Sequence, residues 1–588
     1  MKQKMSEKTI RKNKAYSDSF IAFMIVTCGV LLSCITVFFG YDILPDYQDK
    51  LVHLRRIAAL ADTLRAGYFP SRIYFSMNES TGYAMSVFYP DLFLYLPAFL
   101  YIVGIPLSYC YAVYVVTVNV VTAVISYYCL VRFLKGDKIP AAVMSFVYTL
   151  SVYRLTDIYI RDALGEYTAM AFLPLVIYGY YRIYTAGSSG DRNTLSGIVS
   201  DSIPLGVGMA ALISSHVLTS SMTVFFLMIL SVLLIRKTLK RSVFFRLICS
   251  ALICIGLSLY FLVPFIDYMI SDKYLVNESS KLMRGFYPGW RELLELIPSG
   301  SGSGIEYELR MPTQTGAAIT AILAAWFVRT SIRVLLNKKR DKSEDDKRNL
   351  YIGIIMFGMT GLFLFISSKY FPWTRIESWN NTVSGIICSV QFSWRYIGLA
   401  TVTAVFLGGL LISDISKASV TGARLFSALI ILLAVVPAVI LESRACSENR
   451  HVFIDKGESI GIVSDELYFP VSWNRDASYD MVPVTDDGRV VYDFECKQYR
   501  WNVNMDGITA DRVLFPMVYY KGYVAETPEG DILYTTASED GRVETKLPSG
   551  FNGTFGLRFR SPYYWRIAEI ISLFTAAILC FAGFRQRK

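Results

Sequence analysis

Long uncharged segments alternate with short charged ones along the 588 residues of this chain. Residues 20–40 form one segment without a charged side chain, and residues 217–235 form another. About 20 apolar residues are enough to cross a bilayer as a helix. The pattern therefore predicts an α-helical polytopic membrane protein. Segment 20–40 is long for the core of a signal peptide and no A-x-A site follows it, so we expect it to stay as an anchor.

Basic clusters set the expected orientation of the spans, because Lys and Arg collect on the cytoplasmic side. If every apolar run is a span, Lys135 and Lys138 fall outside. The conflict disappears if segment 87–104, which contains Pro90 and Pro97, is a broken or re-entrant element. Both termini are then cytoplasmic, and about 12 spans are expected near residues 20–40, 110–131, 139–155, 167–184, 198–215, 217–235, 247–269, 315–336, 350–367, 396–412, 425–441 and 564–583.

A change of composition marks the C-terminal quarter of the chain. Residues 442–563 alternate apolar and polar side chains in stretches such as RVVYDFEC, broken by DDG, PEGD and EDG. These are strand and turn signals. We predict a membrane domain over 1–441 with an outer loop at 41–109, and an extracytoplasmic antiparallel β-domain of sandwich type over 442–563. Residues 564–588 then form a last transmembrane helix and a basic cytoplasmic tail.

Composition excludes some functions. The mean hydropathy of +0.40 is that of a membrane protein. In such a chain the net charge of +10 fits basic clusters on the cytoplasmic side better than nucleic-acid binding. Three His residues, without a CxxC or HExxH motif, argue against a structural zinc site or a zinc protease. Cys446 and Cys496 lie in the polar C-terminal part. Either a disulfide or two free thiols fits them.

The first candidate site follows the first apolar segment. Asp46, Asp49, His53 and Arg56 have offsets 0, 3, 7 and 10, which on a helix share one face. Two carboxylates, an imidazole and a guanidinium would then meet where the chain leaves the membrane, a set suited to acid–base chemistry. The alternative is an interfacial amphipathic helix with a solvated polar face.

A second candidate site precedes the expected span 167–184. Arg161, Asp162 and Glu166 lie on the expected outer side, and the two acids are four residues apart. Ion-paired groups at the end of a span are the alternative explanation. His216, between two spans, is either a further site residue or an interhelical hydrogen-bonding group.

Arg395 closes the motif Gln-Phe-Ser-Trp-Arg, just before the expected span 396–412. An Arg beside aromatic rings at the outer face can bind a lipid phosphate with two hydrogen bonds. Anchoring of the span at the interface by Trp394 and Tyr396 is the alternative.

An ordered set of motifs now supports a resemblance. Asp49-x3-His53-x2-Arg56 is followed by GYFPxR at 67–72 and FYP at 88–90, then by RDALGE at 161–166, QFxWR at 391–395 and YFP at 468–470. This series resembles the bacterial membrane family labelled 6-pyruvoyl-tetrahydropterin synthase-related. The C-terminal β-domain with its last span resembles the YfhO-like membrane proteins. Both families are similar in architecture to GT-C glycosyltransferases.

The resemblance implies a glycosyltransferase in the bacterial plasma membrane, which moves a hexosyl or pentosyl group from a polyprenyl-phosphate donor to a glycan or lipid acceptor during cell-envelope assembly. It implies Asp49 or Asp46 as the first catalytic acid, and Asp162 or Glu166 as the second. His53, Arg56, Arg161, His216 and Arg395 are the expected substrate-binding groups. The first loop lacks the family's paired acids, so the choice of base and any divalent metal stay open.

Two other functions fit the same residues. One is a non-catalytic membrane protein that binds or moves lipid-linked glycans. The other is a scaffold that presents the β-domain. Membrane lipids are expected partners in every case, and nucleic acids are not.

The orientation can be tested by labelling intact cells with a membrane-impermeant maleimide. A Lys135→Cys variant is expected to show no labelling above the unchanged chain, whereas a Ser303→Cys variant is expected to be labelled, because only residue 303 lies outside. External labelling at position 135, or none at 303, contradicts the twelve-span topology.

Overall fold

The computed structural model describes residues 2–39, 49–186, 194–279, 283, 287–298, 311–335, 344–447, 466–474 and 480–585. The chain forms two compact units. The first comprises Met1–Lys50, Ala112–Cys254 and Lys281–Phe453, and the second comprises Leu51–Tyr111, Ile255–Ser280 and Ile454–Lys588. Asp46 lies outside the described residues.

The first unit is helical. Two long helices, α6 (Leu107–Phe133) and α14 (Arg241–Ser271), each begin in one unit and end in the other. The other helices of the first unit are α1 (Lys2–Leu32), α2 (Ile35–Phe39), α7 (Lys138–Thr149), α8 (Val152–Tyr159), α9 (Leu164–Met170), α10 (Leu173–Ala186), α11 (Leu195–Ile213), α12 (Val217–Leu233), α13 (Ile235–Thr238), α16 (Trp290–Leu293), α17 (Ala317–Leu335), α18 (Glu344–Ser367), α19 (Trp373–Glu377), α20 (Thr382–Cys388), η3 (Ser393–Arg395), α21 (Tyr396–Ala418) and α22 (Val420–Ser447).

The helix lengths identify a membrane protein. Among the described residues, seven helices are long and apolar enough to cross a bilayer: α6, α11, α14, α18, α21 together with η3, α22 and α23. The prediction of a polytopic helical membrane protein is therefore confirmed. The predicted count of about 12 spans is not confirmed.

Two expected spans are interrupted helices. Segment 139–155 divides into α7 and α8, because Ser151 between them has an extended backbone. Segment 167–184 divides into α9 and α10. The turn at residues 160–163 lies between these two interruptions. The short helices α8 and α9 therefore flank it directly.

Segment 87–104 also forms short pieces. Its helices are α4 (Met85–Phe88), the 3₁₀ turn η1 (Leu92–Leu94) and α5 (Tyr95–Ile102). Eight residues of helix are only about 12 Å long, far less than the roughly 30 Å of a bilayer core. The lengths agree with the prediction that this segment does not cross.

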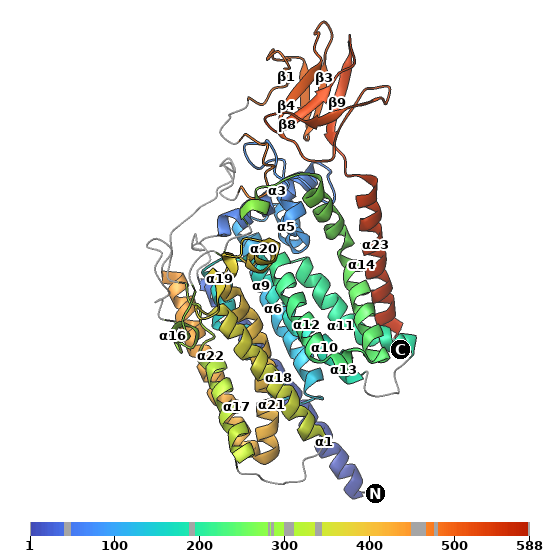
Figure 1. Cartoon of the computed structure of the whole chain (residues 1–588). Coiled ribbons are helices and arrows are strands. Elements are labelled where there is room, and N and C mark those ends of the chain that lie inside the picture. Colours follow the sequence, from blue (N-terminus) through green and yellow to red (C-terminus); the bar gives the residue numbers. More distant parts are fainter. Residues whose placement is uncertain are drawn as a thin grey trace. The chain divides into compact units, whose positions relative to one another are not determined.

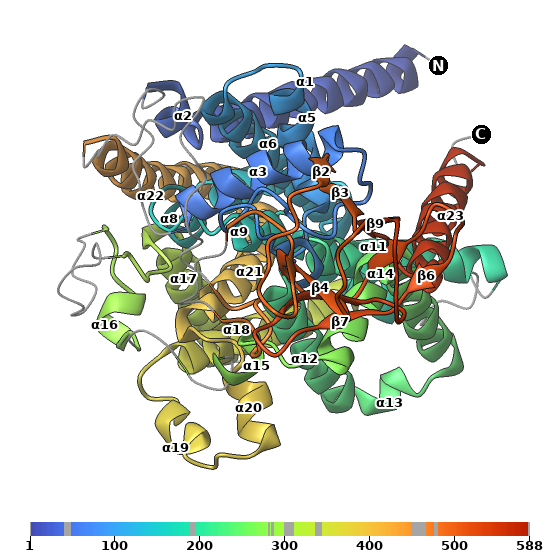
Figure 2. The same cartoon turned by 90° about the horizontal axis from the view of Figure 1, so that it is seen from above.

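Helix α21 forms the centre of the first unit. Nearly all of it is buried, and α17, α18 and α22 pack beside it (Figures 1 and 2). On another side of this unit, α10 and α11 approach closely because of glycines. A Cβ atom on Gly208 would lie 2.9 Å from Val176 Cγ2, and one on Gly179 would meet the backbone of Leu205. Small residues allow such contacts between helices.

The second unit contains the strands. It holds α3 (Lys50–Arg65), α4, η1, α5, α15 (Val276–Ser279) and α23 (Tyr563–Arg585). Its strands form two antiparallel sheets, β1-β4-β8-β7 and β2-β3-β9-β5-β6. The bounds are β1 (Val484–Thr485), β2 (Phe494–Lys497), β3 (Arg500–Asn504), β4 (Arg512–Val518), β5 (Tyr523–Glu526), β6 (Ile532–Leu533), β7 (Thr535–Ala537), β8 (Arg542–Lys546) and β9 (Thr554–Phe559).

The two sheets share an aromatic core. Trp501 of β3 contacts Phe515 of β4, with ring centroids 5.7 Å apart, and Phe515 contacts Phe555 of β9. Buried and exposed residues alternate along β3 and β9, as expected for strands with one face inward. The prediction of a C-terminal antiparallel β-domain is therefore confirmed. Residues 442–447, which we assigned to this domain, continue helix α22 instead.

A buried ion pair joins three parts of the second unit. Arg72 Nη2 donates to Glu569 Oε1 of α23 at 2.8 Å and to the Tyr260 carbonyl of α14 at 2.9 Å. Ser572 receives a hydrogen bond from the Tyr260 N–H, so α14 and α23 lie side by side (Figure 1). Removing one member of a buried pair leaves the other charge uncompensated.

Glu569 contacts two Arg side chains, Arg72 and Arg566, and replacing each in turn gives a matched comparison. Arg72→Ala is expected to destabilise the chain by about 3–5 kcal/mol, because Arg72 is buried. Arg566 also contacts Glu569, but the Arg566 side chain is half exposed. Arg566→Ala is therefore expected to lower the stability by at most about 1 kcal/mol. The midpoint temperature of thermal unfolding in detergent measures both. Equal losses would contradict the role given to Arg72.

Candidate active site

A tight turn between α8 and α9 brings the second set of predicted residues together. The Ala163 N–H bonds the Asp157 carbonyl at 2.9 Å, and Asp162 has a φ of +52°. Asp is one of the few residues that tolerate this left-handed backbone. Because the turn ends α8 and α9 begins only at Leu164, Asp162 and Glu166 do not share a helical face. The expected i,i+4 relation is wrong here.

Arg161 lies between two carboxylates. Its Nη1 donates to Asp157 Oδ1 at 2.6 Å and to Glu166 Oε2 at 3.0 Å. All three side chains are nearly fully buried. Such a cluster is stable only when the charges compensate one another.

Arg395 reaches the same carboxylate from a distant part of the chain. Its Nε donates to Glu166 Oε2 at 3.1 Å, while its Nη1 donates to the Val390 carbonyl and to Gln391 Oε1. Tyr153 donates to the other oxygen, Glu166 Oε1, at 2.6 Å. Glu166 therefore has both oxygens occupied and holds two guanidinium groups beside each other.

The two carboxyl groups beside Arg161 differ in charge. Burial raises the pKa of Glu166, but Arg161 and Arg395 outweigh it and bring the pKa to about 2. Burial, with the Glu166 charge, raises the pKa of Asp157 well above its usual range. Asp157 Oδ2 is buried and has no hydrogen-bond partner among the described residues, as suits a protonated oxygen. Glu166 is thus the carboxyl group whose charge the two guanidinium groups favour most.

Asp49 lies against this cluster. Its N–H donates to the Arg161 carbonyl at 3.3 Å, and its side chain is exposed. Burial lowers the pKa of Arg161, but Glu166, Asp157, Tyr153 and Asp49 together raise it above the usual range. An exposed carboxylate thus borders a buried positive group. The structure brings Asp49 and the 161–166 turn together, although α3 begins only at Lys50, so Asp49 does not extend that helix as the spacing predicted.

His216 caps α12 beside the cluster. Its Nδ1 lies 2.8 Å from the Thr219 hydroxyl oxygen and 3.4 Å from the Thr219 backbone nitrogen. Burial, followed by the Arg395 charge, lowers the pKa of His216 to about 3. At neutral pH this imidazole is uncharged and can donate a hydrogen bond without adding charge.

His53 and Arg56 belong to the second unit, where they form a separate buried group. Arg56 donates to the carbonyls of Tyr89 and Pro90, each at 3.0 Å, and its guanidinium lies 4.1 Å from the centre of the Tyr89 ring. Its Nη1 lies 3.4 Å from His53 Nδ1, so these two do share a helical face. These contacts hold the turn after α4.

Sequence reasoning did not single out three members of the cluster: Tyr153, Asp157 and Gln391. The i,i+4 spacing of Asp157 and Arg161 was a usable signal. Gln391 lies four residues before Arg395 in the motif at 391–395, which was a further local signal. Tyr153 has no such signal, because its partner Glu166 is 13 residues away. Among the described residues, no group of three or more His, Cys, Asp or Glu side chains is arranged to hold a metal ion. Cys446 and Cys496 are free thiols.

Comparison with known proteins gives a loose likeness in fold. No family model and no curated protein matches the chain. The apo oligosaccharyltransferase of Archaeoglobus fulgidus has 13% identity and a TM-score of 0.41 over 72% of this chain and 56% of that one. The same organism's AglB, in complex with an inhibitory peptide and a dolichol-phosphate, has 13% identity and a TM-score of 0.39 over 74% and 57%.

This chain thus spans a little over half the length of those proteins. Membership in the pterin-synthase-related or YfhO-like families is not confirmed, because no family model matches.

The different charges of the two carboxyl groups make a paired prediction. Asp157→Asn is expected to cost less stability than Glu166→Gln, because the pKa of Asp157 is raised and an amide oxygen can still accept the hydrogen bond from Arg161. Glu166→Gln is expected to cost about 3–5 kcal/mol at pH 7, because two buried guanidinium groups lose their counter-ion. Thermal unfolding in detergent measures both.

The pH dependence has a defined sign. The pKa of Glu166 falls from 4.5 to about 2 on folding, so its stabilisation is complete above pH 4.5 and is lost as the pH falls toward 2. The Glu166→Gln deficit should shrink only in that range. A larger loss for Asp157→Asn than for Glu166→Gln would contradict the charge assignment.

Proposed function

We propose that this chain is a membrane glycosyltransferase of GT-C type, which takes a sugar from a polyprenyl-phosphate donor at the outer face of the membrane. The observation that carries the proposal is the exposed Asp49 carboxylate, fixed through its backbone to Arg161 of a buried pair of guanidinium groups. A base and a phosphate-binding group are the two parts that such a transfer needs.

The leaving group is a phosphate monoester, so the site has to stabilise its negative charge. Arg161 and Arg395 use Nη1 and, in Arg395, Nε for contacts within the protein. Their Nη2 groups bond none of the other described residues. Two guanidinium donors beside each other suit a phosphate.

Asp49 is the proposed base. It takes the proton of an acceptor hydroxyl, whose oxygen attacks the anomeric carbon while the bond to the phosphate oxygen breaks and its electrons leave with the phosphate. One in-line attack inverts the anomeric centre. Glu166 positions the two guanidinium groups and is a poor base, because its oxygens are occupied. Asp162 follows Arg161 directly and is the second candidate acid.

His216 and the remaining predicted residues take supporting roles. Uncharged His216 can donate from Nε2 to the sugar or phosphate. His53 and Arg56 act in the second unit, where they fix the turn after α4. A divalent metal stays open.

Turnover of a panel of polyprenyl-phosphate sugars by the purified chain tests the proposal. Asp49→Asn is expected to lower the rate by about 10²–10⁴-fold, the usual effect of removing a general base. Asp62→Asn is the matched control, because Asp62 lies on α3 and forms an ion pair with the exposed Arg65. It should leave the rate unchanged. Parallel assays with a metal chelator test for a metal.

Two results would overturn the proposal. If the chain binds the donors without turning them over, it is a protein that binds or moves lipid-linked glycans. If it neither binds nor transfers, it is a scaffold for the β-domain. If Asp49→Asn and Asp162→Asn both keep full activity, neither carboxylate is the base.

A further inference from the structure

An apolar groove runs along the first unit, between α10, α12, α18 and α21. It encloses about 290 Å³ and is lined by side chains such as Leu227, Leu230, Ile355, Met356 and Met359. On α18 the lining extends from Arg348 to Phe363, which is about 22 Å of helix. One leaflet of the bilayer core is about 15 Å deep. The groove therefore has the shape and lining for a hydrocarbon chain.

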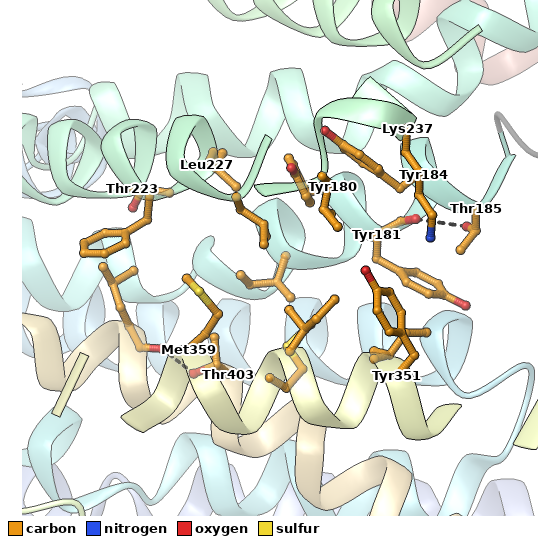
Figure 3. A pocket seen from close by; sticks show the side chains of 18 of the residues that line it. Tyr180, Tyr181, Tyr184, Thr185, Thr223, Leu227, Lys237, Tyr351, Met359 and Thr403 are labelled. Atoms are coloured by element: carbon orange, nitrogen blue, oxygen red, sulfur yellow. Dashed lines mark hydrogen bonds between the residues drawn. The ribbon is translucent and has the colours of Figure 1, made fainter. Parts of the chain in front are cut away.

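Cations gather at one end of this groove. In Figure 3, Lys237, Tyr184, Thr185 and Tyr351 lie at one end, whereas Thr223, Met359 and Thr403 lie at the other. Lys237 lies 4.9 Å from the centre of the Tyr351 ring. Hydroxyl and ammonium groups thus mark a polar end, and the other end is largely apolar.

A polar pocket adjoins that end. It encloses about 590 Å³ and shares Tyr181, Thr185 and Arg348 with the groove. Arg132 and Arg182 line it as well. The groove and the pocket together therefore present four cationic side chains around one opening.

The nearby carboxylates cancel only part of these charges, because each carboxylate is shared by two cations. Asp201 is held by both Arg182 and Arg246, at 2.9 and 3.1 Å. Asp345 lies 2.8 Å from Lys135 and only 3.4 Å from Arg348. Arg348 Nε is buried and has no hydrogen-bond partner among the described residues. The net positive charge left at the mouth of an apolar groove favours an anionic group there.

We propose that this groove binds an anionic glycerophospholipid of the inner leaflet, with its phosphate at Lys237 and Arg348 and one acyl chain along α18. The inner leaflet follows from the orientation expected from the basic clusters, since Lys237 and Arg348 lie near those clusters. The site does not depend on the proposed glycosyl transfer, because the Glu166 cluster contributes no residue to it.

The chain, purified in detergent and freed of lipid, can be titrated with phosphatidylglycerol and with phosphatidylcholine of the same acyl chains. Native mass spectrometry counts the bound lipid. We expect at least tenfold tighter binding of phosphatidylglycerol. The double variant Lys237→Gln/Arg348→Gln replaces both groove cations and should weaken phosphatidylglycerol binding about thirtyfold. Each lost charge is expected to contribute about fivefold, and the two effects multiply. Lys240→Gln/Arg241→Gln removes the same charge away from the groove and should leave the affinity unchanged.

A second variant separates the site from folding defects. Met356→Trp fills the groove without changing charge and should abolish binding of both lipids, while thermal unfolding shows whether the chain is intact. Equal affinity for the two lipids would overturn the proposal, as would equal losses in the two double variants. Displacement of phosphatidylglycerol by polyprenyl phosphate at equal concentration would also overturn it, by assigning the groove to the donor.

Discussion

The buried Glu166 carboxylate is the interaction on which the candidate site depends. Two guanidinium groups, Arg161 at the α8–α9 turn and Arg395 before α21, meet on one of its oxygens. Without it their mutual repulsion would separate the turn from η3. Because Tyr153 occupies the other oxygen, Glu166 is a counter-ion that sets positions and leaves proton transfer to another group.

This arrangement also explains why the exposed Asp49 is a better base than its buried neighbours. The pKa of Glu166 is lowered to about 2, so Glu166 is a weak base, and both of its oxygens accept hydrogen bonds within the protein. Asp157 is fully buried, and one of its oxygens accepts from Arg161. Asp49 remains solvent-accessible while its backbone is fixed to the Arg161 carbonyl, which places a carboxylate at the edge of a positive group.

Much of the fold could be predicted from hydrophobic patterning, because bilayer thickness and strand alternation act locally in sequence. The non-spanning segment around Pro90 and the C-terminal β-domain are examples. The interruptions at Ser151 and after Met170 were missed, since apolar side chains continue through them. Pairing of Glu166 with Arg395 and Tyr153 could not be predicted, because it depends on how the helices pack. No local pattern in a single sequence reports contacts between distant helices. Placement of His53 and Arg56 in the second unit was missed for the same reason.

The most direct measurement is an experimental structure of the full chain with polyprenyl phosphate bound. We expect phosphate oxygens within about 3 Å of Nη2 of Arg161 and Arg395, with the Asp49 carboxylate facing the side from which an acceptor would attack. A phosphate bound away from both guanidinium groups, or an Asp49 carboxylate turned away from it, would contradict the account.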